Sequence, residues 1–230
     1  MKYILTIIFL GMVQSYTSEN ALEVKKPYGV IDDSFSVNEM GAFNHIIPLE
    51  IVPGINNMAP QLSLVYDSRN KASRLGKGWS ITGLSKITRT GKTIIHHGET
   101  DRIEFDDEDG LALDGQTLVL TSGEHFKSGA LYKTENETFQ EIIAEGSHCT
   151  SYVSQGCSKN SPNNFIVRKT NGTRYFYGKS NNQYQNSKVT VQTEVIPEVL
   201  EWNITRIEDQ FGKFIEFEYF IDDLELGTKC

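Results

Sequence analysis

The sequence has no surplus of basic residues, no second apolar run and few cysteines, and each shortage excludes a class of protein. Its 22 Lys and Arg stand against 30 Asp and Glu, which gives a net charge of -8. Nucleic-acid binding needs clustered cations to meet the phosphates, so this balance argues against it. After the first residues, no apolar stretch is long enough to cross a bilayer. The three cysteines allow at most one internal disulfide, which would leave an odd thiol.

The chain also lacks the glycine patterns that bind nucleotides, although Leu75–Arg89, LGKGWSITGLSKITR, is rich in glycine. A P-loop needs Lys and then Ser or Thr directly after its last glycine, whereas Gly78 is followed by Trp79. The dinucleotide pattern needs a third glycine where Ile81 stands. The stretch is therefore predicted to be a turn that feeds a strand, with Trp79 anchoring it in the core. Gly83 is expected at a bulge or a close packing contact.

The first fifteen residues, MKYILTIIFLGMVQS, have the pattern of a secretory signal peptide. Lys2 precedes an apolar run from Tyr3 to Val13, and cleavage is expected after Ser15 or a few residues later, up to about residue 21. The alternative is a membrane anchor or a core helix, but the run is too short to span a bilayer. The pattern predicts a secreted, extracellular protein. Residues 16–40 are polar and irregular, and are expected to form an extended lead-in to a domain at 41–230.

From residue 41 onward the apolar residues recur with period two, and no stretch shows convincing 3.6-residue periodicity. HIIPLEIV places Ile47, Leu49 and Ile51 on one face before Pro53–Gly54 ends the run. This alternation is typical of half-buried β-strands.

Turn signals separate these runs at short intervals. Asp114–Gly115, Asn171–Gly172 and the segment from Asp209 to Gly212 each lie between two alternating runs, as the turn of a hairpin does. The mature chain is therefore predicted to be all-β, with roughly ten to fourteen short strands. Hairpins adjacent in sequence favour a meandering, curved sheet or sandwich.

Cys149 and Cys157 bracket a polar stretch, TSYVSQG, that could close into a disulfide loop in an oxidising compartment. Cys230 would then be the odd thiol. A metal site is the rival interpretation, but this pair has no second pair of ligands to complete four.

Two polar clusters could be taken for metal sites, but each is better interpreted as a solvated turn or strand end on the surface. The acidic run DDEDG, Asp106–Gly110, lacks the ligand spacing of a calcium loop, and a solvated acidic turn is the simpler interpretation. His97, Glu99 and Asp101 would share one face of a strand, but no further ligand is recognisable near them. A surface strand end is expected there.

Glu216 and Glu218 are two residues apart, as are the glutamates of ADP-ribosylating toxins. In FIEFEYF they fall on one face of a strand opposite apolar residues, which is simple amphipathic alternation. The other elements that such enzymes need have no clear counterpart. Tyr175 and Tyr177 could stack on a sugar, but packing in a sheet is the commoner use of such a pair.

The run from Pro48 to Arg89, PLEIVPGINNMAPQLSLVYDSRNKASRLGKGWSITGLSKITR, resembles the opening of the SpvB-type N-terminal domain. That domain begins the SpvB virulence protein and the B component of the insecticidal Tc toxin complexes. DRIEFDDEDGLALDGQTLVL, FIVRKTNGTRYFYG and EWNITRIEDQFGKFIEFEY resemble its later blocks. The resemblance covers roughly residues 41 to 219 and is more specific than any single motif.

The resemblance implies a structural role in a β-rich shell built with Rhs-type repeats, with any toxin activity in a separate C-terminal domain. It implies no catalytic residue, cofactor or metal site in this chain. The partners that it implies are other toxin-complex or Rhs-type chains or domains. The chain stops at Cys230, before any propeller or repeats, so the domain is expected to be truncated at its C-terminus.

We therefore expect a secreted, non-enzymatic scaffold of a Tc B-component or SpvB-like protein. A stand-alone exported module that binds a surface glycan or protein is the alternative, and an ADP-ribosyltransferase is a third. The residues expected to matter are structural: Pro53, Gly54, Gly76, Gly78, Trp79, Gly83, Asp114, Gly115, Asn171 and Gly172.

Overall fold

The computed structural model describes residues 33–54, 58–73, 75–148, 158, 160–179, 187–193 and 197–219, all within one compact unit, Asp33–Cys230. The predicted signal peptide, residues 1–15, lies outside the described residues, and so do Cys149 and Cys157.

Strands dominate the described residues, so the predicted all-β class is confirmed. The exception is a single helical turn, α1 (Ile94–His97), where the sequence predicted the end of a surface strand. That prediction was wrong because Gly98, left-handed at φ 76°, closes the turn with an N–H donated to the Ile94 carbonyl at 3.0 Å. No helix in the described part is long and apolar enough to cross a membrane.

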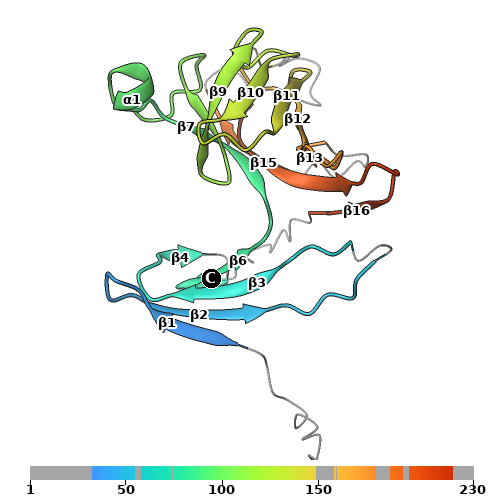
Figure 1. Cartoon of the computed structure of the whole chain (residues 1–230). Helices are drawn as coiled ribbons and strands as arrows, with labels where there is room; N and C mark the ends of the chain where they lie inside the picture. The colour runs from blue at the N-terminus through green and yellow to red at the C-terminus, as the bar shows by residue number, and fades with distance from the viewer. Residues whose placement is uncertain are drawn as a thin grey trace, which may run out of the picture. The chain divides into compact units, whose positions relative to one another are not determined.

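The first strands form a four-stranded antiparallel sheet with the order β1-β2-β3-β6 (Figure 1). Their bounds are Ser34–Val37 for β1, Phe43–Pro48 for β2, Ser63–Asp67 for β3 and Trp79–Thr82 for β6. β1 thus lies in the segment expected as an extended lead-in. β2 ends at Pro48, which has no N–H to donate to a ladder, and Leu49 and Ile51 lie beyond it. A short pair, β4 (Ala72–Ser73) and β5 (Gly76–Lys77), comes between β3 and β6 in the sequence.

The strands from β7 onward form a second antiparallel sheet, which closes on itself as an eight-stranded barrel. Each strand from β7 to β13 pairs with the next, and β15 pairs with both β13 and β7. The bounds are Lys86–Thr90 (β7), Gly110–Leu113 (β8), Gln116–Ser122 (β9), Leu131–Thr134 (β10), Glu141–Glu145 (β11), Asn164–Arg168 (β12), Arg174–Tyr177 (β13) and Pro197–Glu208 (β15).

Two further strands pair with β15 outside the ring: β14 (Lys188–Gln192) and β16 (Phe214–Glu216), which follows β15 through the third predicted hairpin. Figure 1 shows β15 in orange-red as the longest strand, with β13 and β16 beside it. The sequence predicted the meander of hairpins. It left open a curved sheet or a sandwich, and the pairing of β15 with β7 closes the curved sheet into a barrel.

Tight turns join neighbouring strands where the sequence predicted them. Asp114 and Gly115 are both left-handed, at φ 49° and 83°, which is the type I′ geometry that matches the twist of β8 and β9. The Asn171–Gly172 turn between β12 and β13 is wider. Only Gly172 is left-handed there, at φ 81°, and its N–H donates to the Lys169 carbonyl at 3.0 Å. Such a turn combines a type I bend with a glycine bulge.

Large apolar side chains fill the barrel, and Trp202 on β15 is the bulkiest of those that are fully buried. Its ring meets Phe165 edge to face, with 5.0 Å between centroids, and its Nε1–H donates to the Pro162 carbonyl at 3.0 Å. Gly178 passes directly against this ring, because a Cβ there would lie 2.6 Å from Trp202 Cδ1. The chain after β13 can therefore approach the core only as glycine.

We predict that Trp202→Ala lowers the free energy of unfolding by about 3–5 kcal/mol, since it removes a fully buried aromatic side chain. Trp79→Ala should cost less, because Trp79 is only half-buried, in the other sheet. Urea unfolding followed by circular dichroism measures both. Equal losses for the two variants would contradict this assignment of the core.

Candidate functional site

A charged side chain lies inside the barrel: Arg89 on β7, which is inaccessible to solvent. Strand alternation places it on the same face as Ile87, which is fully buried in the core. A guanidinium in such a place costs free energy unless its charge and its donors find partners. The surroundings of Arg89 therefore decide whether this is a reactive site or a structural one.

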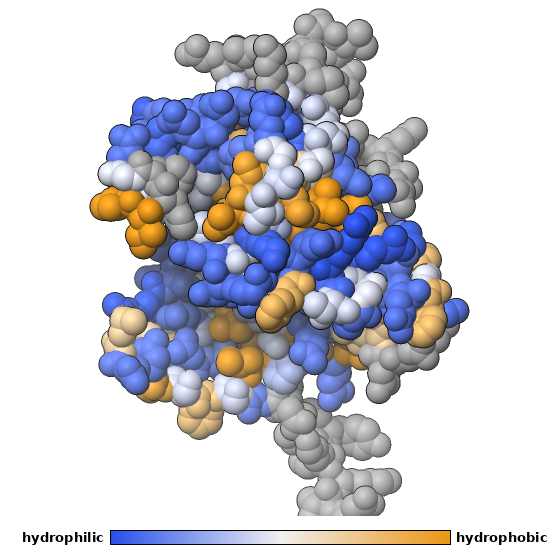
Figure 2. Space-filling view, turned by 45° about the horizontal axis from the view of Figure 1, so that its top comes forward, coloured by the Kyte–Doolittle hydropathy of each residue, from blue (hydrophilic) through white to orange (hydrophobic). Residues whose placement is uncertain are grey.

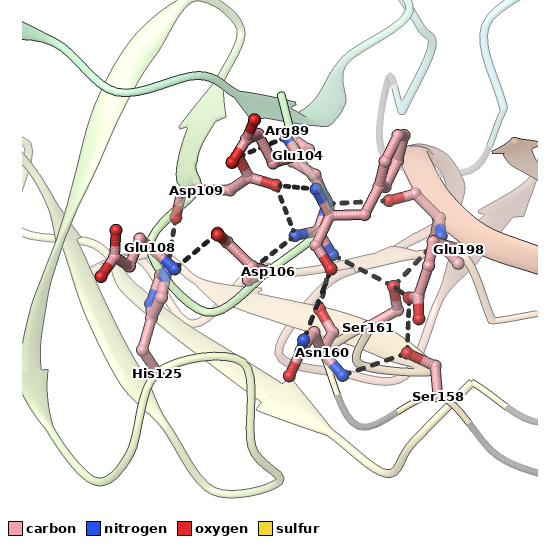
Figure 3. Close-up of polar contacts among 12 residues, drawn as sticks. Arg89, Glu104, Asp106, Glu108, Asp109, His125, Ser158, Asn160, Ser161 and Glu198 are labelled. Carbon is pink, nitrogen blue, oxygen red and sulfur yellow. Dashed lines mark hydrogen bonds and ion pairs between the residues drawn. The ribbon is translucent and has the colours of Figure 1, made fainter. Parts of the chain in front are cut away.

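All five N–H donors of this guanidinium are used within the chain (Figure 3). They donate to the carbonyl oxygens of Val199, Asp106 and Asn160, to Asp109 Oδ2 at 3.1 Å and to Ser161 Oγ at 3.1 Å. The ring of Phe126 adds a cation–π contact, 4.2 Å from its centroid to Cζ. Burial lowers the pKa of Arg89, while the neighbouring carboxylates, Asp109 foremost, oppose that shift.

Asp109 organises the acidic loop in front of β8. Its carboxylate is buried, and it accepts the backbone N–H groups of Glu104 at 3.1 Å and Phe105 at 2.7 Å in addition to Arg89. The sequence predicted DDEDG as a solvated acidic turn. Asp107 and Glu108 are indeed exposed, but for Asp109 that prediction was wrong, because this carboxylate turns inward to pair with the buried cation.

On the other side of Arg89, Ser161 connects it to Glu198 near the start of β15, and Ser158 binds the same carboxylate. Ser161 Oγ accepts from Arg89 and from the Val199 N–H at 3.1 Å, and it donates to Glu198 Oε2. Ser158 Oγ donates to the same carboxylate oxygen at 2.5 Å. We call this set, Arg89, Asp109, Ser158, Ser161 and Glu198, the arginine network.

A second chain of hydrogen bonds runs from the arginine network to β10. His125 Nε2 lies 2.8 Å from the Asp109 carbonyl, which can only accept, so Nε2 carries the proton. His125 Nδ1 then accepts from the Tyr132 hydroxyl at 3.1 Å, and that hydroxyl accepts the Phe126 N–H at 2.9 Å. Burial raises the pKa of Tyr132 to about 12, so the phenol stays protonated and holds this order.

A hollow of about 590 Å³ lies beside the acidic loop, between Lys92 and β9. Lys92 Nζ pairs with Glu108 and, at 3.1 Å, with Glu99. These hydrogen bonds raise the pKa of Lys92, so it remains a cation. Within the described residues, no group of three or more His, Cys, Asp or Glu could hold a metal ion.

The arginine network is therefore a structural site rather than a reactive one. Its guanidinium has no donor left to bind a substrate. It links β7 to the acidic loop, the segment at 158–161 and β15, and it satisfies backbone carbonyls of all three of these partners.

The residues singled out from the sequence do not come together at one site. Pro53–Gly54 lies in the loop after β2, and the Asp114–Gly115 and Asn171–Gly172 turns lie at the ends of barrel strands. Gly83 has the close packing contact that was predicted, since a Cβ there would lie 1.9 Å from the Gln61 carbonyl oxygen.

The remaining predicted residues lie in β5, at the start of β6 or between these two strands. Gly76 and Gly78 are left-handed, at φ 106° and 86°. The prediction that Trp79 lies in the buried core was wrong. Its ring is half-buried on one face of the first sheet, with 5.3 Å between its centroid and that of Tyr66. Only the structure shows that the buried tryptophan is Trp202.

Glu216 and Glu218 are exposed, and the apolar residues between and beside them are half-buried, which confirms the amphipathic alternation. Glu216 Oε1 lies 3.5 Å from an Arg206 guanidinium nitrogen across the strand pair. The residues that sequence reasoning missed are those of the arginine network. One signal was available: in KITRT the alternation puts Arg89 on the face of Ile87.

We predict that Arg89→Met lowers the free energy of unfolding by about 3–5 kcal/mol, because it leaves the buried carboxylate of Asp109 without its cation. Lys86→Met, the same kind of change on the same strand, removes a half-exposed pair with Glu201 and should cost about 1 kcal/mol or less. Urea unfolding of the two variants tests this. An Arg89→Met protein as stable as the Lys86→Met control would show that the network adds nothing.

Comparisons with known proteins place this fold. The sequence matches the family described as SpvB, the Salmonella virulence plasmid 65kDa B protein, over residues 37–229. No curated protein matches the chain. The fold is similar to a crystal structure of TcdB2-TccC3, with a TM-score of 0.61 and 17% identity over 84% of this chain and 9% of that one.

It is also similar to the Tc holotoxin pore of Photorhabdus luminescens, with a TM-score of 0.59 and 16% identity over 84% of this chain and 9% of that one. This chain thus spans only a small part of the length of the toxin chains that share its fold. At such identities the likeness shows the fold alone, whereas the family match covers most of the chain. The protein therefore belongs to the SpvB family.

Proposed function

We propose that this chain is a non-enzymatic β-scaffold that contributes to a shell or assembly with other toxin-complex or Rhs-type chains or domains. The observation that carries the proposal is the arginine network, whose buried guanidinium has all five donors satisfied by the chain itself. A catalytic arginine keeps donors for its substrate, and this one does not. Family membership and the fold shared with Tc toxin structures support the same role.

Edge pairing is the mechanism of assembly that we propose. Within the described residues, β1 pairs only with β2, whereas β14 and β16 pair only with β15, so each has one side without a partner strand. Such edges present rows of N–H and C=O groups that a further strand can complete. The signal-like first residues support export, so the assembly would form outside the cell.

A second candidate is a stand-alone exported module that binds a surface glycan or protein. Exposed aromatic rings favour it: Phe35, Phe139 and Phe211 are each more than two-thirds exposed. On the face in Figure 2 hydrophilic residues dominate, and hydrophobic residues surface in separate patches. A glycan array probed with the mature domain would support this candidate by specific binding and weaken it by none.

Cross-linking and mass spectrometry of the native protein, recovered separately from cells and from culture medium, test the leading proposal. We expect the chain outside the cell, without its signal, cross-linked to chains with toxin or Rhs-type repeats in mass spectrometry. We also expect no NAD hydrolysis, because nothing in the described site is arranged for it. Hydrolysis that disappears in Glu218→Ala would overturn the non-enzymatic role, and an extracellular chain without polypeptide partners would favour the stand-alone module.

We also propose a disulfide between Cys149 and Cys157. The residues on either side of this segment lie together, since the Ser158 N–H donates to the His148 carbonyl at 2.7 Å and the His148 N–H donates to the Ser161 carbonyl at 2.8 Å. Chain ends held at this spacing suit the short Cα–Cα distance of a disulfide.

Closing so short a loop should stabilise the fold by about 2.5 kcal/mol through the entropy of the unfolded chain. We expect an intact mass lower than that of the reduced chain by two hydrogen atoms, and a loss of about 2.5 kcal/mol in the free energy of unfolding in Cys157→Ser. Cys230→Ser is the matched control and should change neither quantity. A mass unchanged by reduction would disprove the bond.

A further inference from the structure

The first sheet has one apolar face and one polar face, which its strand register defines. One face carries Phe35, Val37, Phe43, His45, Ile47, Leu64, Tyr66, Trp79 and Ile81, and we call it the aromatic face. The opposite face carries Ser34, Ser36, Asn44, Ile46, Pro48, Ser63, Val65, Asp67, Ser80 and Thr82. A sheet with one apolar face is stabilised when another layer covers that face, or when further strands extend the sheet and pack their apolar side chains beside it.

Ring contacts run across the aromatic face from strand to strand. Phe35 lies 6.5 Å from Phe43, Phe43 lies 6.3 Å from Tyr66, and Tyr66 lies 5.3 Å from Trp79, between centroids. None of the nine side chains is buried by described residues, and exposure is greatest on β1, where Phe35 is 75% and Val37 67% exposed. The unmet apolar surface is therefore concentrated at one edge of the sheet.

The edge strand β1 lacks the devices that keep edges from pairing. Its sequence, Ser-Phe-Ser-Val, has no charge and no proline, and its register with β2 is unbroken over all four residues. The other strands of three or more residues with a free side differ from β1. β14 has a register irregularity after Val189, and β16 is only three residues long and contains Glu216. β6, at the far edge of the same sheet, is half-buried at Trp79 and Ser80, whereas β1 is exposed throughout. β1 is thus the best template for strand addition in the described chain.

We propose that β1 pairs antiparallel with β1 of a second copy of this chain, about a twofold axis at Ser36. In this register Phe35 of each copy lies opposite Val37 of the other on the aromatic face, and the two Ser36 side chains meet on the polar face. Within β1, aromatic rings meet β-branched side chains, hydroxyls meet hydroxyls, and no residue is charged. Just outside the strand, Asp33 of each copy falls opposite Glu39 of the other, which weakens the pairing. The strand is therefore complementary to itself.

The pairing would join two four-stranded sheets into one of eight strands with a continuous aromatic face. Four residues per strand bury less than the roughly 1,200–2,000 Å² of a standard interface. The dimer should therefore be weak and should dissociate on dilution. This inference rests on the edge of β1 and does not require the toxin assembly proposed above.

Sedimentation velocity of the mature chain from about 5 to 200 μM tests the proposal, in a Cys230→Ser background that removes the odd thiol. We expect a reversible monomer–dimer equilibrium. Ser36→Lys places two cations opposite each other at the axis and should weaken the dimer about tenfold or more. Thr82→Lys adds the same charge on β6, at the far edge of the sheet, and should leave the dimer unchanged.

Circular dichroism should show that both lysine variants stay folded, because Ser36 and Thr82 are exposed. A wild-type chain that is monomeric at every concentration would overturn the proposal. So would a Ser36→Lys protein that dimerises like the wild type, or a Thr82→Lys protein that loses the dimer. Failure here would leave the test of toxin partners untouched, since that test measures different chains.

Discussion

The backbone pairing of β15 with β7 along one edge and with β13 along the other is the constraint on which the barrel depends. Without it, the strands from β7 to β13 would form an open meander with two exposed edges. β15 also supplies the centre of the core through Val199, Trp202 and Ile204. Closure of the barrel and packing of its core therefore depend on each other, because β15 provides both.

Closure also explains why a charged residue lies inside. Segments that cross the end of a barrel bring backbone carbonyls out of water, and each needs a donor. Arg89 supplies five donors from one rigid group, and carbonyls at Asp106, Asn160 and Val199 accept three of them. Asp109 balances the charge. The arginine network is thus a means of ordering the loops around the buried guanidinium.

The two sheets differ in how far their apolar faces are covered. In the barrel, the apolar side chains point inward from all sides and are fully or almost fully buried. The first sheet also has an apolar face, but the side chains on it are half-buried or exposed, and its edge strand β1 is exposed throughout. Surface that a fold leaves uncovered is where contacts with other chains are expected.

Local features followed from the sequence, and long-range ones did not. Period-two alternation and the Asp114–Gly115 and Asn171–Gly172 turns depend on neighbouring residues, so strands and hairpins were predictable, and the SpvB resemblance agrees with the family. The helical turn α1 escaped prediction because a single glycine cap decided it.

Only the tertiary structure decided that the meander closes, that Trp202 rather than Trp79 is the buried tryptophan, and that Asp109 turns inward. Each of these depends on contacts between residues far apart in the chain. Arg89 and Ser161 are separated by 72 positions, and no local pattern records that they meet. The sequence determined which elements form, because propensity and turn chemistry act locally; the partners of each element were decided by packing, which acts at a distance.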